Sequence, residues 1–296
     1  MYRDYSSFLS EHFSGKVQKI AVNAGFTCPN RDGTVGRGGC TYCTNEAFNP
    51  PYCDARLGVT EQLERGKSFF ARKYPNMDYL VYFQAYSNTH APVDKLRELY
   101  EEALAVDGVV GLVVATRPDC LGDGVAELLR DISARTKLIV ELGVESAHDD
   151  TLARINRCHN WTTSRMAIER LSQCGVIVGV HLILGLPGED EAMMEQTVKA
   201  VASLPVSLVK FHQMQVLKGT MLARQWQDGE VELKQWTAQE YASLCARLLR
   251  LLPPRVAVER FVSQSPPSML LSPRWNMKPG EFAQLLKGAL IENENS

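Results

Sequence analysis

The chain has 296 residues, of which 45% are hydrophobic and 22% are charged, and its formal net charge is −2. This length can bury a large core, and the composition shows no long basic block of the kind that many nucleic-acid-binding proteins carry. The N-terminal residues lack a secretion signal and no apolar run reaches the length of a membrane span, so we expect a cytoplasmic protein without membrane contact. In that compartment the eight cysteines should be reduced thiols or metal ligands, not disulfides.

Apolar, β-rich runs alternate with helix-like stretches through the first 216 residues. Strands are expected at 19–24, 79–84, 111–116, 138–144, 176–184 and 207–215, where short apolar runs are bounded by Gly, Pro or Asn. Helices are expected at 60–73, 93–105, 123–134, 162–174 and 189–204, where apolar residues recur at spacings of three and four. Repeated β–α units imply a parallel sheet with right-handed crossovers. Because six units fall short of an eight-fold barrel, we predict an α/β protein built on a partial (β/α)6 TIM-like barrel.

The pattern changes after residue 216. A helix is expected at 237–251, a short strand at 256–262 and a proline-rich tail beyond them. We therefore predict three parts: an N-terminal segment of residues 1–15, the partial barrel of residues 16–216, and a C-terminal α/β extension of residues 217–296 that packs on the barrel.

Three cysteines near the start, Cys28, Cys40 and Cys43, follow the spacing C-x11-C-x2-C on a glycine-rich loop. A [4Fe–4S] cluster is usually held by four cysteines, so three leave one iron open to a small molecule. Glycines let such a loop adopt positive φ angles and approach an inorganic core closely. The alternative is a structural zinc site with a fourth ligand such as Cys53, although zinc ribbons usually show two close cysteine pairs and this loop shows one. We expect Cys53 not to be a ligand of the cluster.

Polar residues stand near the ends of the predicted strands, where α/β sheets bind ligands. Glu141, Gly143 and Glu145 share one strand face, and two carboxylates beside a glycine leave room for a hydroxyl-bearing ligand such as a ribose. A buried Glu needs a partner, and Arg154 or Arg157 just downstream is available. The alternative interpretation of these residues is a purely structural Glu–Arg pair.

Two further strand ends carry polar side chains. Arg117 either binds a carboxylate or phosphate, or pairs with Asp119 two residues later. The exit of the strand at 79–84 presents groups that can hydrogen-bond an amino-acid head group, namely Gln84, Tyr86, Ser87 and Asn88.

The last two strands of the barrel supply histidines and a lysine. His181 is expected on the inner face of its strand, although a single strand histidine is more often a satisfied core residue than a ligand. The turn that follows, with Leu186 and Pro187, has glycines on both sides that let a flat ring lie on the backbone. Lys210 and His212 alternate onto one face of the next strand, as substrate contacts or as an ordinary strand end.

In this order, the motifs resemble the radical S-adenosylmethionine (SAM) superfamily over about residues 16–262. More closely, they are similar to the radical-SAM domain of the Elongator catalytic subunit and its small bacterial relatives that act on the wobble uridine of tRNA. The matching segments are the cysteine triad, 116–119, 141–146, 156–159, Lys210 with 219–222, and 253–254. The chain departs from that pattern with a longer first cysteine spacing, with Glu145 in place of Gln, and with Cys158 in place of Gly.

Carried over residue by residue, the resemblance implies that Cys28, Cys40 and Cys43 bind a [4Fe–4S] cluster whose open iron is chelated by SAM. It implies Tyr42 near the adenine, Glu145 on the ribose and Arg157 on the SAM carboxylate. The remaining expected SAM contacts are Gln84, Ser87 and Asn88 toward the amino group, although the usual Gly-Gly-Glu is missing there, and His181, Leu186 and Pro187 beside the adenine. The candidate catalytic residues are Lys210, His212 and Tyr86.

The activity implied by the resemblance is reductive cleavage of SAM to a 5′-deoxyadenosyl radical, supported by an electron donor such as flavodoxin or ferredoxin. The expected substrate is the side chain of a tRNA wobble uridine. One alternative is radical chemistry on a small molecule such as a porphyrinogen, which suits the near-neutral charge. Another is a non-enzymatic iron–sulfur or zinc protein.

If tRNA is the partner, basic residues must gather at the barrel mouth. We expect them from two segments that meet there, one with Lys210, Lys218 and Arg224 and one with Arg260, Arg274 and Lys278. An unstacked base would then have Trp275 or Tyr86 to stack on.

Overall fold

The computed structural model of the chain describes residues 2–44, 50–71 and 77–294. Its centre is an eight-stranded sheet with the order β1-β9-β7-β6-β5-β4-β3-β2, in which each neighbouring pair is parallel. The strands are β1 (Arg3–Asp4), β2 (Val17–Val22), β3 (Asp78–Phe83), β4 (Val109–Thr116), β5 (Lys137–Glu145), β6 (Ile177–Leu184), β7 (Leu208–Gln213) and β9 (Ala257–Arg260).

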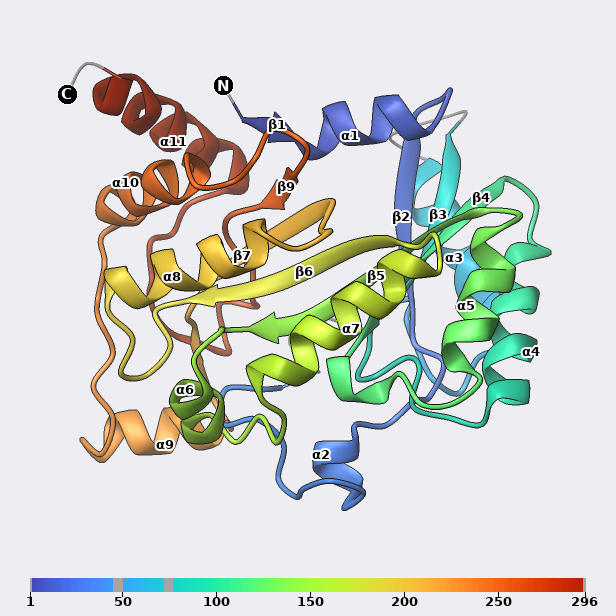
Figure 1. Ribbon diagram of the computed structural model, residues 1–296, viewed down its shortest axis with the longest axis horizontal. Coiled ribbons are helices and arrows are strands. Elements are labelled where there is room, and N and C mark those ends of the chain that lie inside the picture. The colour runs from blue at the N-terminus through green and yellow to red at the C-terminus, as the bar shows by residue number, and fades with distance from the viewer. Residues whose placement is uncertain (1, 45–49, 72–76, 295–296) are drawn as a thin grey trace.

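Strands β2 to β7 are neighbours in the sheet in the same order as in the chain, and a helix connects each to the next. The connecting helices are α3 (Val59–Ala71), α4 (Val93–Leu104), α5 (Val125–Ser133), α7 (Trp161–Gln173) and α8 (Glu191–Ala202). Figure 1 shows α7 and α8 lying across one side of the curved sheet. The partial (β/α)6 barrel predicted from the sequence is confirmed.

The strands are apolar on both faces for two different reasons. On the outer face, residues such as Val81, Val114 and Val140 are fully buried beneath the helices. On the inner face, a smaller cluster at the start of the strands includes Leu80 and Ile139 and packs around Phe8, whose side chain is fully buried. Phe8 belongs to α1 (Tyr5–His12), which therefore closes one end of the partial barrel.

Several elements were not expected from the sequence, among them β1, α1 and α11. The segment before residue 16 contains β1 and α1, and β1 pairs with β9, which in turn pairs with β7, so the sheet has two strands beyond the predicted six. Helix α11 (Pro279–Glu294) occupies the expected proline-rich tail. It begins at a proline, which the first turn of a helix tolerates, and it buries Phe282, Leu286 and Ala289 at helical spacing.

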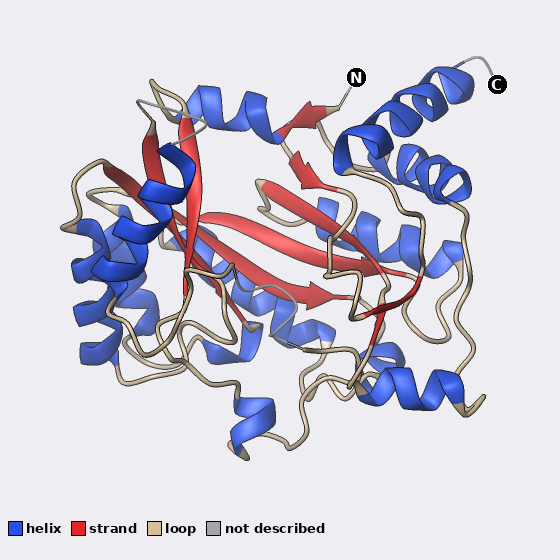
Figure 2. Ribbon diagram, turned by 180° about the vertical axis from the view of Figure 1, so that it is seen from behind, coloured by secondary structure: helices blue, strands red, loops and turns tan. Residues whose placement is uncertain are grey.

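The C-terminal part packs on the end of the sheet beyond β7. Helix α10 (Ala238–Leu249) starts with a capping box between Thr237 and Glu240, and it packs against α11. Strands β8 (Val216–Leu217) and β10 (Leu270–Ser272) form a small antiparallel pair, and α9 (Met221–Gln227) follows β8. Figure 2 shows both chain ends at the edge of the molecule where β1 and β9 lie. Among the described helices, none combines the length and the apolar character needed to cross a membrane.

Candidate active site

A cavity of about 230 Å³ lies at the carboxyl-terminal half of strands β3 to β7. Parallel α/β sheets bind their ligands at this edge. Cys28, Cys40 and Cys43 all belong to the cavity lining, so the structure brings the three predicted cluster ligands to one wall of a single site. We call this side of the cavity the cysteine wall.

The cysteine wall is shaped by backbone hydrogen bonds. The carbonyl of Cys28 accepts from Arg31 N at 2.7 Å and from Asp32 N at 3.0 Å, which forms the short helix α2 (Pro29–Asp32). That helix ends at Gly33, whose φ of 94° an L-residue with a side chain rarely adopts. Thr41 fixes the segment on two sides, because its N–H donates to Ile155 O and its carbonyl accepts from Leu222 N. In Figure 1, α2, α6 (Asp149–Arg154) and α9 accordingly lie at the same edge of the molecule.

The residues present fit a [4Fe–4S] cluster better than a single metal ion. The three cysteines are free thiols, and the described ranges contain no group of three or more His, Cys, Asp or Glu arranged around one ion. A cube takes one thiolate per iron, so its ligands stand apart instead of converging on one point. Cys53 lies outside the lining; its thiol donates to Ala21 O at 2.9 Å, and burial raises its pKa to about 12. The fourth ligand considered for a zinc site, Cys53, is therefore not at this wall.

Buried polar atoms without a protein partner also mark the cavity as a ligand site. Among the described lining residues these atoms include Ser87 Oγ, Arg157 Nε and His212 Nε2. A buried polar group normally has a hydrogen-bond partner, and leaving one unpaired costs about 1–3 kcal/mol. These atoms are available to a bound ligand.

Arg157 joins the cysteine wall to β5. Its Nη1 lies 3.4 Å from Cys40 Sγ, while its Nη2 donates to Gly143 O and lies 3.4 Å from Glu145 Oε1. A Cβ at position 143 would lie 2.6 Å from Arg157 Nη2, so this contact requires a glycine. Glu145 has a φ of 68°, a left-handed conformation that is uncommon outside glycine and often marks functional sites. The Glu–Arg pair anticipated from the sequence is present, and both of its members also line the cavity.

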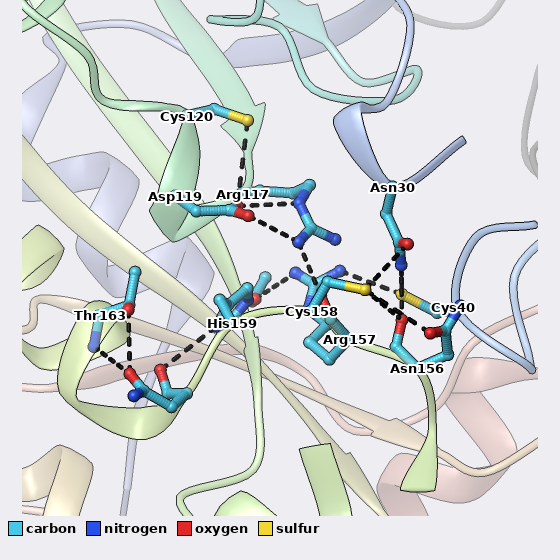
Figure 3. Close-up of polar contacts among 12 residues, drawn as sticks. Asn30, Cys40, Arg117, Asp119, Cys120, Asn156, Arg157, Cys158, His159 and Thr163 are labelled. Atoms are coloured by element: carbon cyan, nitrogen blue, oxygen red, sulfur yellow. Dashed lines mark hydrogen bonds and ion pairs between the residues drawn. The ribbon is translucent and has the colours of Figure 1, made fainter. Parts of the chain in front are cut away.

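A second arginine, Arg117, holds the segment that carries Arg157. Arg117 binds Asp119 through two contacts of 2.8 Å, and its Nη2 also donates to Arg157 O at 2.7 Å. Figure 3 shows Arg117 between Asp119 and the Arg157 segment. The pairing interpretation of Arg117 is thus confirmed, but its Nη1 is buried without a partner and the residue lines the cavity. Burial, together with Arg157, lowers the pKa of the adjacent His159 to about 3, so this ring is neutral at pH 7.

The other end of the cavity rests on a buried ion-pair network, which we call the floor. Lys19 Nζ lies 3.0 Å from Glu141 Oε1 and 2.8 Å from Glu259 Oε2, and Lys210 Nζ lies 2.5 Å and 3.1 Å from the same two carboxylates. Burial alone would raise the pKa of Glu141, but Lys19 and Lys210 hold it well below its usual value. Burial lowers the pKa of Lys210 to about 8 despite both carboxylates.

Two histidines stand between the floor and the open cavity. His181 Nε2 lies 3.1 Å from Glu141 Oε2, and His212 Nδ1 lies 2.6 Å from Ser263 Oγ. Their ring centroids are 5.0 Å apart and both rings line the cavity. Burial lowers the pKa of both, so both are largely neutral at pH 7. Arg260 lines the same region, and its buried Nε has no partner in the described part of the chain.

The structure separates the expected SAM contacts into two groups. Six of them line the cavity, namely Tyr42, Gln84, Ser87, Glu145, Arg157 and His181. Asn88, Leu186 and Pro187 are not part of the lining. Asn88 Nδ2 donates to Ala115 O at 2.7 Å, Leu186 packs in a small cluster beside Tyr42, and Pro187 O accepts from Arg154.

The catalytic candidates also separate. His212 and Tyr86 line the cavity, and Tyr86 is 39% exposed with a φ of 62°. Lys210 lies beneath the lining, only 3% exposed, so the expectation that it meets a phosphate at the mouth is wrong. It reaches the cavity only through Glu141 and the hydroxyl of Tyr82, 3.4 Å from its Nζ. The expectation that Trp275 stacks on a substrate base is also wrong. Trp275 packs on Phe282 and donates to Trp236 O inside the C-terminal part.

Several residues of the site were missed from the sequence, above all Lys19, Glu259 and Ser263. They come from strands or loops far apart in the chain, and no motif connects them. The signal that was available is a charge inside an apolar strand, as with Lys19 in β2 and Glu259 in β9. Such a charge is buried only if it is paired.

Comparisons with known proteins cover most of the chain. A family model described as the radical SAM superfamily matches residues 27–201, and one described as the radical SAM C-terminal domain matches residues 206–291. The uncharacterized protein YtqA of Bacillus subtilis (strain 168) is 39% identical over 295 residues, which cover 100% of this chain and 91% of that protein. The tRNA uridine(34) acetyltransferase of Methanocaldococcus jannaschii is 27% identical over 165 residues, which cover 55% of this chain and 30% of that protein.

Among solved structures, the archaeal Methanocaldococcus infernus Elp3 with an N-terminal deletion is similar with a TM-score of 0.70 at 17% sequence identity. The match covers 95% of this chain and 64% of that chain. At this level of identity the likeness shows a shared fold.

Proposed function

The chain belongs to the radical SAM superfamily of enzymes, and from that premise we propose that Cys28, Cys40 and Cys43 hold a [4Fe–4S] cluster that binds and cleaves SAM. We also propose that the substrate is the side chain of a wobble uridine in tRNA. The observation that carries the first proposal is the shared cavity lining. The three thiols face the same space as Glu145 and Arg157, which offer a carboxylate and a guanidinium for a ligand with hydroxyls and a carboxylate.

When bound, the cluster and SAM supply the 5′-deoxyadenosyl radical that takes a hydrogen atom from the substrate. The chain's own part is to bind, to orient and to exclude water. Glu145 is placed to accept hydrogen bonds from ribose hydroxyls, and Arg157 has a buried Nε free for an acceptor. Below the site, Phe8 of α1 packs against the start of the strands and the floor fills the space above it, which restricts the entry of water from that side.

The substrate side of the cavity is polar. His212 Nε2 and Arg260 Nε are buried without partners, and Tyr86 stands at the more exposed end of the lining. We propose that His212 and Arg260 hydrogen-bond the hydrophilic side chain of the substrate and that Tyr86 stacks on its base. Lys210 acts indirectly in this scheme, by keeping Glu141 charged beneath His181.

A tRNA substrate is supported by relatives and by surface charge. Relatives named tRNA uridine(34) acetyltransferase match this chain over about half its length, although the chain covers only 30% of one such protein. Two exposed basic residues lie on segments next to the cavity lining. Lys218 follows β8 and its N–H donates to Met269 O in the tail, and Arg224 lies on α9, which is hydrogen-bonded to the cysteine wall through Leu222.

The experiment that tests this proposal has two stages. Anaerobic reconstitution should give about four irons per chain, and addition of SAM with a flavodoxin or ferredoxin system should release 5′-deoxyadenosine. Total tRNA from cells with and without the gene is then compared by mass spectrometry of its nucleosides. A change confined to wobble uridines supports the substrate assignment. If deoxyadenosine is released but the tRNA is unchanged, the substrate is a small molecule instead of tRNA. If the protein holds one tightly bound zinc and no iron, both the cluster proposal and the substrate proposal are wrong.

A further inference from the structure

We propose that Asn30 is a positioning residue for the cluster, because its side-chain amide donates a hydrogen bond to the sulfur of Cys40 and so tunes the potential at which the cluster accepts an electron. This inference rests on the cluster assignment above. It adds a residue that lies between Cys28 and Cys40 but is not part of the cavity lining.

The geometry around Asn30 fixes its orientation. The residue is fully buried, its Nδ2 lies 2.5 Å from Asn156 O and 3.8 Å from Cys40 Sγ, and its Oδ1 accepts from Cys158 Sγ at 3.1 Å. Figure 3 shows the amide held between these three partners. A carbonyl oxygen can only accept, so the NH2 group must face Asn156 O. The second N–H of the same group is then the one that faces Cys40, and N–H···S contacts are longer than N–H···O contacts because sulfur is larger.

The loop is built to admit this side chain. A Cβ at Gly36 would lie 2.2 Å from Asn30 Oδ1 and 2.8 Å from Cys158 Sγ, so the loop closes over Asn30 only because position 36 is glycine. The turn opposite contains Asn156 and Cys158, both with positive φ, at 54° and 61°. A turn with two such residues is strained and persists only where surrounding contacts hold it.

Asn30 shares the work of holding the loop with Asn156, whereas the contact with the sulfur belongs to its second N–H. Asn156 Nδ2 donates to Gly39 O at 2.8 Å and to Arg37 O at 3.2 Å, which ties the loop to the turn independently of Asn30. The N–H directed at Cys40 adds little to that attachment. Its other effect is electrostatic, and it acts together with Arg157 Nη1, 3.4 Å from the same sulfur.

Two donors on one thiolate stabilise the more negative, reduced state of a cluster. Hydrogen bonds to the sulfurs are among the factors that set the potential of iron–sulfur clusters, and partners of ligands tune metal sites in general. Loss of the Asn30 donor should therefore make the cluster harder to reduce, with no change in its iron content.

The test compares Asn30→Asp, Asn30→Ala and Cys158→Ala in the full chain. Asn30→Asp keeps the shape and the acceptor for Cys158 but replaces the NH2 group, which donates to Cys40 Sγ and to Asn156 O, by an oxygen. Cys158→Ala is the matched control, because it removes the partner on the other side of the same amide and leaves the N–H in place. Each protein is reconstituted anaerobically, its iron is counted, and its midpoint potential is measured by redox titration followed by electron paramagnetic resonance.

We expect both Asn30 variants to hold wild-type iron and to titrate at a more negative potential, with the larger shift for Asp, whereas Cys158→Ala titrates as wild type. Wild-type potentials in both Asn30 variants, or an equal shift in Cys158→Ala, would overturn the proposal. If the Asn30 variants lose the cluster, the proposal is tested on wild-type protein labelled with 15N in its Asn side chains. Pulsed electron paramagnetic resonance of the reduced cluster then shows whether an Asn 15N nucleus couples to it. The absence of a 15N coupling overturns the proposal. A wild-type chain that binds no iron refutes the cluster assignment instead.

Discussion

The cysteine wall and the floor close the same cavity in opposite ways. The wall is a short glycine-rich loop whose thiols lie within sixteen residues of each other, and its shape comes from backbone hydrogen bonds. The floor takes one charge from each of β2, β5, β7 and β9, and its partners Lys19 and Glu259 are 240 residues apart. A loop with backbone-held thiols suits a cofactor shared across a family. A floor of paired charges inside a sheet depends instead on the folded register of four strands.

This contrast predicts that substitutions in the wall and substitutions in the floor affect different properties of the protein. Changes in the wall should abolish the cofactor while the fold persists, because the loop contributes little apolar burial. Changes in the floor should lower the free energy of unfolding first, because they leave buried charges without partners.

The largest effect is expected at the wall. Replacing Cys28, Cys40 or Cys43 by Ala should remove the cluster and all deoxyadenosine formation, since each thiolate holds one iron. Cys53→Ala is the matched control, because Cys53 is equally a free thiol but donates to Ala21 O outside the cavity, and its cluster should be intact. Iron content, visible absorption and the far-ultraviolet circular dichroism are measured together. Loss of the cluster in Cys53→Ala would mean that the cluster depends on a thiol outside the cysteine wall.

At the floor, Glu141→Gln should reduce the free energy of unfolding by about 3–5 kcal/mol, because it breaks a buried pair and leaves Lys19 and Lys210 with one carboxylate. Denaturant unfolding at pH 7 measures the change. The control is Glu169→Gln, which breaks an exposed pair with Arg165 and should cost less than about 0.5 kcal/mol.

The same variant should alter the dependence of stability on pH. The folded-state pKa of Glu141 is held well below its ordinary value of 4.5, so its contribution is full above that value and is lost as the pH falls through the folded pKa. Glu141→Gln should therefore be less stable than wild type at pH 7 and should approach it in acid. A constant difference between the two proteins at all pH values would mean that Glu141 is not ionised in the floor.

The wall could be predicted from the sequence, whereas of the floor the sequence pointed only to Glu141 and Lys210 and not to their pairing with Lys19 and Glu259. The strands β2 to β7 were found because their apolar runs are buried on both faces, and Cys28, Cys40 and Cys43 because their spacing is a local motif. Glu141 and Glu145 were predicted because they stand near a strand end, and Arg157 because it lies just downstream in the segment 156–159. The floor needs the register of β9 beside β7, where Lys210 lies opposite Arg260, and nothing local in the chain encodes that pairing. Asn30 was missed for a related reason, because its partner Asn156 lies 126 residues away.

A smaller effect is expected where the wall meets β5. Glu145→Ala should weaken SAM binding by about 1–3 kcal/mol, because it removes a charge-assisted acceptor for the ribose. Its cluster content should equal that of wild type, since Glu145 is linked to the wall only through Arg157. Equilibrium binding of SAM to reconstituted protein gives the change, with Glu195→Ala as control, because Glu195 is half-buried on α8, pairs with Lys199 and lies outside the cavity lining. Equal SAM affinity in both variants would make Glu145 a structural partner of Arg157 alone.

The smallest effects should come from single basic residues at the mouth. These effects decide whether the substrate that enters the cavity is part of a nucleic acid. Lys218→Ala and Arg224→Ala should each weaken tRNA binding similarly for different tRNAs and should reduce the slope of log affinity against log salt by about 1, because each removes one phosphate contact. Both side chains are exposed, so the fold should not change. Arg135→Ala is the control: this residue precedes β5 at the amino-terminal edge of the sheet, where it pairs with Glu101, so its loss should leave the slope unchanged. If all three variants bind alike, the mouth does not meet phosphates. The polar groups around His212 and Arg260 would then serve a small hydrophilic molecule.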